Sequence, residues 1–459
     1  MRAIILSLLL VLGGCASQAG PSSVTAEPAD LAITNLNVVQ VSTGTVVPAQ
    51  TVLIADGRIV SIQEAASRPV AAARVVDGAG GYLIPGLVDA HAHLEHERNA
   101  EMLKLFVGYG VTTVRSMDGR PYILEWRDRI AAGELIGPRI HTAGPILDGE
   151  SPIRRDNTVV ADPAAGRAAV VAQAAAGYDF IKIYDRVSPA TLDAILDEAA
   201  EQSMRVGGHP PDDAPMSDVL RAFWSIEHMT SFMGAVRAEG PETPWWVDNW
   251  LGAPVDEARA QILAAELAAS DVWVVPTLWE RERSAARPET LETWMSDPVL
   301  AHVGEAARDF WRSSLTRASR RLEEDDRAAA ARGHQQRLAL TRRLHEAGVR
   351  LVVGTDTPNP FVVPGEAAHR ELEMFAAAGL TPLEALRAAT SGPLEMIYGE
   401  MGEPIRPGAR ADLVILGANP LEDIAGTRDI QAVVLAGQLF DRDAVLALRS
   451  AYAASADAS

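Results

Sequence analysis

The chain is short of cysteine and of positive charge. A single cysteine, Cys15, stands among 459 residues, which excludes an internal disulfide and any metal site built from cysteines. Lysine and arginine number 41 against 61 aspartate and glutamate, for a formal net charge of −20. A chain this acidic repels polyanions, so we expect it to bind no nucleic acid and no anionic lipid headgroups.

The sequence opens with an apolar run that is too short to span a bilayer. In "MRAIILSLLLVLGGC", Arg2 precedes the run and small residues lead to Cys15. This stretch resembles a bacterial lipoprotein signal, which implies removal of residues 1–14, a lipid on Cys15 and a polar tether over 15–30. The absence of aspartate after the cysteine then favours the periplasmic side of the outer membrane, with membrane contact only through the lipid. The alternative is an ordinary secretory signal and a soluble periplasmic or secreted protein.

Both ends of the mature chain predict short β-strands. Residues 31–63 alternate apolar and polar side chains around a hairpin turn at Asp56-Gly57, and "ADLVILGANP" and "IQAVVLAGQLFD" repeat this character near the C-terminus. We therefore predict a small composite β-sandwich built from residues 31–83 and 405–445.

The middle of the chain predicts an α/β fold, a (β/α)8 barrel over residues 84–404. Short apolar runs alternate with alanine-rich helical patterns such as 162–177, 190–202, 256–269 and 366–378. An open doubly wound sheet is the alternative, but no glycine-rich phosphate fingerprint follows the first run. Residues 279–349 are too long for a plain connection, so we predict a helical insertion there. The eight runs are 86–91, 110–115, 138–144, 179–184, 204–209, 224–229, 271–278 and 350–356.

Six polar residues fall at the carboxyl ends of these predicted strands, where barrel enzymes carry their chemistry. Because strand side chains alternate between two faces, the two histidines of "HAH" share one face. Each histidine taken alone could equally be a hydrogen-bonded core residue. The occurrence of six such residues at the ends of five strands favours a functional site. The six are His91, His93, Lys182, His209, His228 and Asp356.

These segments resemble the amidohydrolase superfamily, in the branch whose two metal ions are bridged by a lysine. The resemblance runs from about residue 31 to 440 and is carried by "PGLVDAHAHLE", "FIKIYDRVSP", "GGHP", "SIEHMT" and "GTDTP". The second of these is most similar to prolidase-like dipeptidases and imidazolonepropionase-like hydrolases.

The resemblance implies two divalent metal ions. His91, His93 and Asp356 would hold one ion, His209 and His228 the other, and Lys182 carboxylated by CO₂ would bridge them. A free ammonium cannot bind a metal, whereas a carbamate offers two oxygens. Imidazole and oxygen ligands suit zinc, with manganese, cobalt or nickel as alternatives in vitro. The plain alternative for Lys182 is an ion pair with a carboxylate.

The implied activity is hydrolysis of an amide C–N bond in a small molecule, a dipeptide or an N-acyl amino acid. A hydroxide bridging the metals would attack the carbonyl, and Asp356 would carry its proton to the leaving group. Pro210-Pro211 after His209 departs from peptidase-like members, which often have alanine there. The alternatives are a cyclic amide or lactone substrate on the same centre, and a non-catalytic binding lipoprotein. A homo-oligomer is left open.

Four further residues are candidate substrate contacts. His141 lies at the predicted end of the third strand, and Arg154 and Arg155 lie in the loop that follows this strand. Tyr184 lies beside Lys182. Each has a plain alternative, as a core histidine, a barrel-filling tyrosine or a solvated arginine. The tryptophans of "WWVDNW" (245–250) and Trp279 would either line the mouth or pack the inserted helices. The remaining histidines are interpreted as surface residues or as supports of the ligands: His96, His302, His334, His345 and His369.

Overall fold

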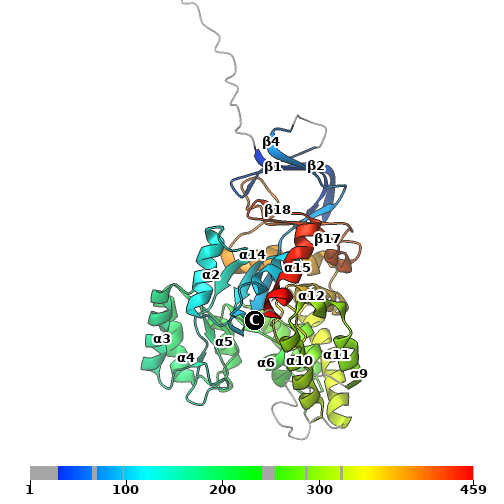
Figure 1. Ribbon diagram of the computed structural model, residues 1–459. Coiled ribbons are helices and arrows are strands. Elements are labelled where there is room, and N and C mark those ends of the chain that lie inside the picture. The colour runs from blue at the N-terminus through cyan, green and yellow to red at the C-terminus, as the bar shows by residue number, and fades with distance from the viewer. Residues whose placement is uncertain are drawn as a thin grey trace, which may run out of the picture.

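The computed structural model describes residues 29–64, 70–96, 98–239, 254–284, 288–320 and 324–457. The signal segment, Cys15, most of the predicted tether and the tryptophan-rich segment 245–250 lie outside these residues. Two bodies make up the described part, a small β domain and a larger barrel (Figure 1).

The β domain is one curled sheet of eight strands drawn from both ends of the chain, as the sequence predicted (Figure 1). Its order is β18-β17-β16-β5-β1-β2-β3, with β4 paired to β1. Strand β1 begins at Ala29, so it takes in the last two residues predicted as tether. The strands are β1 (Ala29–Gln40), β2 (Thr45–Ala55), β3 (Arg58–Glu64), β4 (Ala72–Asp77), β5 (Tyr82–Pro85), β16 (Leu413–Leu416), β17 (Ile430–Leu435) and β18 (Gln438–Phe440).

The β2–β3 hairpin turns at the expected dipeptide. Asp56 and Gly57 have φ values of 50° and 70°, and Ala55 pairs with Arg58 across the turn. Positive φ at both central residues is the type I′ geometry, whose twist matches that of the flanking strands. The inward residues of this sheet, including Leu36, Ile54 and Leu83, are fully buried and form a core separate from that of the barrel.

The eight predicted barrel strands are all present as parallel strands, which confirms the fold class. They form one seven-stranded and one three-stranded sheet, joined by the bridges Ala143–Phe180 and Ala92–Thr357. The third strand is broken and resumes as β9. The strands are β6 (Leu87–Ala92), β7 (Val111–Ser116), β8 (Arg139–Thr142) with β9 (Leu147–Asp148) and β10 (Thr158–Val159), β11 (Phe180–Ile183), β12 (Arg205–Gly208), β13 (Ser225–Glu227), β14 (Trp273–Val275) and β15 (Arg350–Leu351).

Asp89 joins the last strand segment to the first. Its carboxylate accepts hydrogen bonds from the Thr355 hydroxyl at 2.6 Å, from Thr355 N at 3.0 Å and from His91 N at 3.1 Å. His91 O in turn accepts from Asp356 N at 2.8 Å. A buried carboxylate held by three donors fixes both segments. The closure of the barrel therefore sets where His91 and Asp356 stand.

Helices cover the barrel, and several begin at the side-chain caps that their sequences provide, such as Asp162 and Ser188. They are α1 (Met102–Gly108), α2 (Pro121–Ala131), α3 (Pro163–Ala176), α4 (Pro189–Glu201), α5 (Met216–Ala222), α6 (Thr230–Ala235), α7 (Glu257–Ala268), α12 (Glu366–Ala377), α13 (Pro382–Ala388) and α14 (Ser391–Tyr398). Short 3-10 turns lie at Leu94–His96, Pro298–His302 and Ile424–Arg428.

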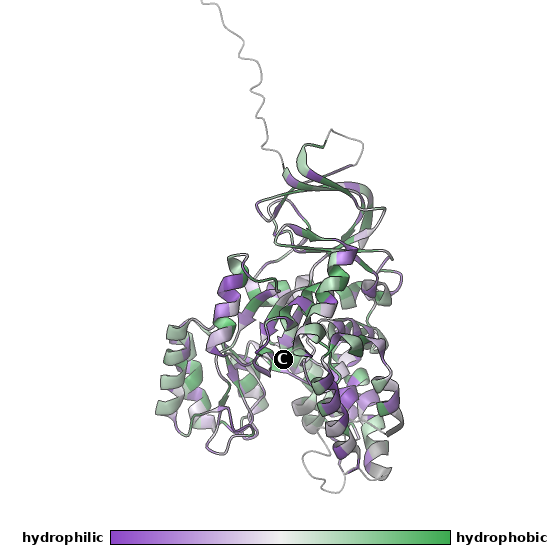
Figure 2. Cartoon of the chain, in the orientation of Figure 1, coloured by the Kyte–Doolittle hydropathy of each residue, from purple (hydrophilic) through white to green (hydrophobic). Residues whose placement is uncertain are grey.

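The segment predicted as an insertion is helical: α8 (Leu278–Ser284), α9 (Pro288–Met295), α10 (Glu305–Ser319) and α11 (Glu324–Glu346). Much hydrophilic colour lies on this group in Figure 2, as expected for solvated helices. The C-terminal helix α15 (Arg442–Ala456) packs on α1, where Arg449 donates to Gly108 O at 2.8 Å. Among the described residues, no helix has both the length and the apolar character to cross a bilayer.

His369 is a core residue, which corrects its interpretation as a surface residue or ligand support. It lies on α12 with 1% exposure, and its ring nitrogens contact the Thr427 hydroxyl at 2.9 Å and Tyr109 O at 3.0 Å. Burial, together with the positive charge of Arg428, lowers the pKa of His369 to about 3. It is therefore neutral in the folded protein, where it links three elements.

We predict that acid destabilises the fold through His369. An unfolded histidine takes up a proton near pH 6.5, so this contribution is complete above pH 6.5 and is lost as the pH falls toward 3. In urea titrations between pH 6 and pH 4, the free energy of unfolding should fall about 1.4 kcal/mol per pH unit more steeply in the native protein than in His369→Gln. His345→Gln on α11 is the matched control, and equal slopes for native protein and His369→Gln would contradict the prediction.

Candidate active site

The six residues singled out in the sequence all lie at the carboxyl ends of barrel strands. His91 is in β6 and His93 one residue beyond it, Lys182 is in β11, and His209 and His228 directly follow β12 and β13. Asp356 follows β15 by five residues. All except His209 are less than a tenth exposed, and the His209 side chain is 13% exposed.

Three imidazoles converge on the carboxylate of Asp356. His91 Nε2 lies 3.3 Å and His93 Nε2 3.2 Å from Asp356 Oδ1, and His228 Nε2 lies 4.0 Å from Oδ2. The ligand atoms of His91, His228 and Asp356 all lie within 4.8 Å of one another, close enough to share one ion. His209 continues the cluster, with its ring centroid 5.0 Å from that of His228.

The other ring nitrogen of each histidine is held by an oxygen. Nδ1 of His91 contacts Glu227 at 2.7 Å, and Nδ1 of His93 contacts Glu95 at 2.7 Å. For His209 the partner is Asp185 at 2.9 Å, and for His228 the Thr277 hydroxyl at 2.6 Å. Metal-binding histidines are oriented in this way, because the Nδ1 contact fixes the ring and leaves the Nε2 lone pair for the ion.

The electrostatics of the cluster favour a cation at its centre. Burial opposes charge on His93, but Glu95 and Asp356 reverse this and raise the pKa of His93 to about 10. Burial would likewise raise the pKa of Asp356, yet His228 and the neighbouring imidazoles hold it well below its usual range. The site thus keeps an ionised carboxylate and attracts positive charge, which a divalent ion satisfies better than a proton.

Lys182 lies fully buried under the histidines. Its Nζ has no hydrogen-bond partner among the described residues. Burial, opposed by Glu227, lowers the pKa of Lys182 to about 8. A buried ammonium without a partner is costly, whereas a neutral amine can react with CO₂. The donor set and this unpartnered amine both fit a pair of divalent ions bridged by a carbamate.

A buried ion pair supports His91 from below. Arg115 Nη2 donates to Glu227 Oε1 at 2.9 Å and to the Ser225 hydroxyl at 2.6 Å, and Arg115 Nη1 donates to Ala90 O at 3.0 Å. Both partners of the pair are fully buried. Burial alone would raise the pKa of Glu227, but Arg115 holds it far below its usual range. Glu227 therefore stays ionised and presents a full negative charge to His91.

Two site residues have backbones in the left-handed region. His228 has a φ of 63° and Asp356 a φ of 59°, and Thr277, which holds His228, has a φ of 49°. Residues other than glycine rarely adopt this conformation, and it clusters at functional sites that the surroundings fix. Here the left-handed conformation directs the side chains that follow β13, β14 and β15 toward the carboxyl rim of the barrel.

A cavity of about 440 Å³ opens above the cluster, a size suited to a small-molecule substrate. Tyr184 and Arg154 face it, and Tyr184 also stacks on His209 with ring centroids 4.2 Å apart. Glu371 accepts from Leu278 N and Trp279 N at 2.8 Å, which fixes the start of α8 beside the cavity. The lining residues are His93, His96, Ile153, Arg154, Tyr184, Asp185, His209, His228, Glu280, Arg281, Asp356 and Asn359.

Two of the predicted substrate contacts lie elsewhere. His141 packs against Phe180, Trp224 and Tyr398 near the amino ends of the strands. The sequence misplaced it because the third strand does not end at Thr142 but continues, after a break, as β9. Arg155 is exposed and does not line the cavity.

Sequence reasoning missed the residues that hold the histidines. Glu227 stands next to His228 in "SIEHMT" and Glu95 two residues after His93, so a carboxylate adjacent to a candidate ligand was the available signal. Arg115 and Thr277 offered no such signal. His96, interpreted as a surface residue or ligand support, lines the cavity and lies 3.3 Å from Glu95.

A (β/α)8 barrel with histidines, a lysine and an aspartate gathered at its carboxyl rim defines a class of metal-dependent hydrolases. The profile of the Amidohydrolase family matches residues 82–440, and the chain belongs to this family. Members of this family depend on metal ions and act on small-molecule substrates.

The chain is similar over most of its length to several solved structures. Bottromycin amidohydrolase is 26% identical with a TM-score of 0.75, covering 93% of this chain and 90% of that one. A putative prolidase from Bifidobacterium longum is 25% identical with a TM-score of 0.66, covering 93% and 100%. Ochratoxinase of Aspergillus niger is 38% identical over 95 residues, which are 19% of this chain and 18% of ochratoxinase.

We predict that Glu227→Gln weakens metal binding. The substitution removes the negative charge behind His91 and leaves Arg115 buried without its counter-ion, so affinity for Zn²⁺ should fall about 10- to 100-fold. Loss of one partner from a buried pair should also cost about 3–5 kcal/mol of stability. Competition with a chromophoric chelator measures the affinity, and urea titration the stability. Glu201→Gln on the exposed face of α4 is the control; unchanged affinity in folded Glu227→Gln would remove Glu227 from the site.

Proposed function

We propose that the protein is a binuclear metal-dependent amidohydrolase that cleaves the C–N bond of a dipeptide or an N-acyl amino acid. The observation that carries this proposal is the convergence of three imidazoles on the Asp356 carboxylate above the buried, unpartnered amine of Lys182.

His91, His93 and Asp356 would hold one ion and His209 and His228 the second, with carboxylated Lys182 shared between them. Imidazole and oxygen donors without thiolate favour zinc. When bound, such ions supply a water of lowered pKa and a Lewis acid for the substrate carbonyl.

Asp356 is the residue placed to move the proton. One of its oxygens lies 4.0 Å from His228 and the other within 3.3 Å of His91 and His93, so the carboxylate stands at the centre of the cluster and also lines the cavity. In the hydrolysis one C–O bond forms and the C–N bond breaks. Asp356 takes the proton that water gives up and passes it to the departing nitrogen, which leaves as an amine.

Tyr184 and Arg154 face the same cavity and are proposed to orient the substrate. The Tyr184 ring stacks on that of His209, and both residues line the cavity. Burial, with Asp185 and Asp356 nearby, raises the pKa of Tyr184 above its usual value, so the hydroxyl keeps its proton and can donate it in a hydrogen bond. Arg154 offers a guanidinium to a substrate carboxylate. The likeness to a putative prolidase supports a substrate of this kind.

Hydrolysis of a cyclic amide or lactone is the second candidate. Pro210 and Pro211, which follow His209, support it because the resemblance to peptidase-like members implies alanine there, so the two prolines weigh against a dipeptide substrate. Either reaction would use the same residues.

We predict that zinc-loaded protein hydrolyses members of a library of dipeptides and N-acyl amino acids, with release of amine measured. Lys182→Ala and His209→Ala should abolish turnover while circular dichroism stays unchanged, because each removes a proposed metal ligand and leaves the backbone hydrogen bonds of the strands in place. Glu201→Gln should keep full activity.

Turnover of lactones alone would favour the second candidate function, and near-native rates in the folded Lys182→Ala and His209→Ala variants would refute the two-metal assignment. A ¹³C-bicarbonate carbamate signal should be present in the native protein and absent from Lys182→Ala.

We further propose that the enzyme is exported and anchored through a lipid on Cys15. The lipoprotein-like "LGGC" supports this, and Cys15 itself lies outside the described residues. In a Gram-negative host, detergent should be needed to extract the native protein from membranes, whereas Cys15→Ser should appear in the soluble or uncleaved fraction and lose incorporation of labelled palmitate. Palmitate labelling that persists in Cys15→Ser would contradict the anchor.

A further inference from the structure

A second cavity, of about 420 Å³, lies at the end of the barrel opposite to the catalytic rim. Its walls come from the β2–β3 turn, from the first residues of β7 and β8, from the end of α2 and from residues that flank β16 and β17. It therefore sits between the β domain and the barrel, and domain interfaces are a common place for small-molecule sites.

Two arginines are held side by side in its wall. Arg58 and Arg410 are partners in an isolated antiparallel bridge, and both line the cavity. Like charges directly opposite each other on paired segments repel, and the repulsion is relieved when an anion lies between them. Arg127 and Arg139 line the same cavity, so four guanidiniums face it in a protein whose net charge is −20.

Asp56 and Asp412 are the two carboxylates among the lining residues, and Asp412 already accepts two hydrogen bonds. Asp412 accepts from Arg410 Nε at 3.1 Å through one oxygen and from Ala436 N at 2.7 Å through the other. The Arg139 guanidinium lies 3.8 Å from Glu400 and 3.9 Å from the centroid of the Tyr398 ring, and its buried Nε has no hydrogen-bond partner in the described part of the chain. Arg58 donates to Gly408 O at 2.9 Å and Arg127 to Asp179 at 3.2 Å. Each guanidinium carries five N–H donors, so these arginines keep donors for a ligand.

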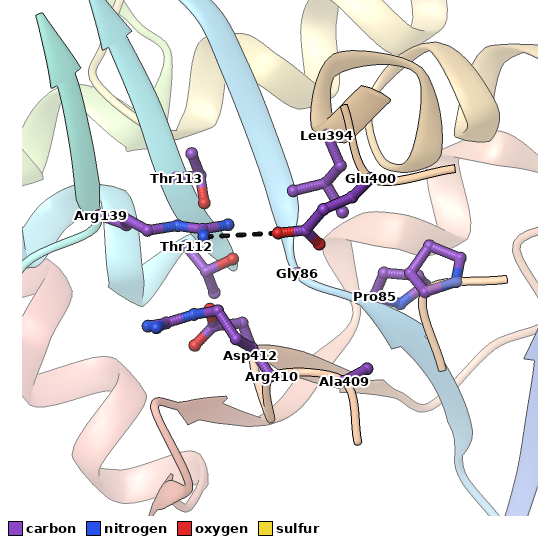
Figure 3. Close-up of a pocket in the computed structure, with 11 residues that line it drawn as sticks. Pro85, Gly86, Thr112, Thr113, Arg139, Leu394, Glu400, Ala409, Arg410 and Asp412 are labelled. Carbon is purple, nitrogen blue, oxygen red and sulfur yellow. Dashed lines mark hydrogen bonds and ion pairs between the residues drawn. The ribbon is translucent and has the colours of Figure 1, made fainter. Parts of the chain in front are cut away.

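The close-up of the adjoining small pocket shows how these groups lie (Figure 3). Arg139 extends from β8 toward Glu400, and Arg410 lies beside Asp412 next to Thr112 (Figure 3). The larger cavity shares Thr112, Arg139, Arg410 and Asp412 with this pocket.

The arginines at this end of the barrel act on a neighbouring histidine. The His141 side chain is 15% exposed, and its partial burial together with Arg115, Arg205, Arg127 and Arg139 lowers its pKa to about 3. Two of these arginines, Arg127 and Arg139, also line the cavity, so the local potential is positive although the chain as a whole is acidic.

The remaining wall is apolar. Phe440 of β18 lines the cavity together with aliphatic side chains from the end of α2, from the segment that follows α2 and from β8. They are Ile130, Leu135, Ile136 and Ile140. A ligand that is complementary to both the arginine-lined wall and the apolar wall has one anionic group and an apolar arm.

We propose that this interdomain cavity binds a small carboxylate with an apolar arm, its carboxylate held by Arg58, Arg139 and Arg410 and its arm packed on Ile136 and Phe440. A guanidinium fork binds a carboxylate through two parallel hydrogen bonds, which makes arginine the suitable partner. This site is independent of the proposed catalytic function, because it lies at the other end of the barrel.

Calorimetric titration of the full chain with octanoate at low ionic strength tests the proposal. We expect saturable binding of one octanoate that weakens about tenfold or more in Arg410→Gln and in Arg58→Gln, since each loses a charge-assisted contact. Acetate and inorganic phosphate, which lack the arm, should bind at least about tenfold more weakly than octanoate, because the apolar contacts are missing. Ile136→Trp, which fills the apolar side, should also abolish binding.

Two controls locate the binding. Arg221→Gln, at an exposed arginine on α5, should leave octanoate affinity unchanged, and so should Asp356→Asn at the catalytic rim. The proposal fails if octanoate shows no saturable binding, if binding persists undiminished in Arg410→Gln and Arg58→Gln, if it is lost in Asp356→Asn, or if phosphate binds as tightly as octanoate. Thermal melting of each variant checks that it is folded, and a shift in melting temperature on adding octanoate provides a second measurement.

Discussion

The carboxylate of Asp356 faces the imidazoles of His91, His93 and His228 because the last strand segment of the barrel is hydrogen-bonded to the first. Asp89 makes that connection by accepting from Thr355 and from His91 N. A shift between these segments would separate the carboxylate from the histidines and leave each buried polar group without its partner. The closure of the barrel and the assembly of the site are therefore one constraint.

Charges buried beneath the site serve the same arrangement. Arg115 and Glu227 are both fully buried, and together they orient His91. A buried ion pair adds little net stability relative to apolar residues, so its presence at this place is better explained by the orientation of a ligand than by folding energy. The unpartnered amine of Lys182 is a second local cost at the same site, and such costs are characteristic of functional centres.

The two ends of the barrel differ in charge. The carboxyl rim gathers carboxylates behind its histidines and attracts cations, which suits metal ions. The amino end gathers arginines around His141 and beside the β domain, where Arg58 and Arg410 lie next to each other. The net charge of −20 describes neither end, because local side chains and low-dielectric surroundings set the potential that a ligand meets.

The sequence by itself determined the eight strands, the composite β domain and the six polar strand ends, because apolar periodicity and strand termini are local properties. It did not determine the supports Arg115 and Thr277, which come close to the histidines only through the closed barrel. His141 shows the limit of local pattern: its strand continues after a break, so a residue predicted to end the strand lies near the amino ends of the barrel strands instead. Which side chains meet across the barrel, and which cavity they face, was decided by tertiary structure, because contacts between residues distant in the chain leave no mark in local pattern.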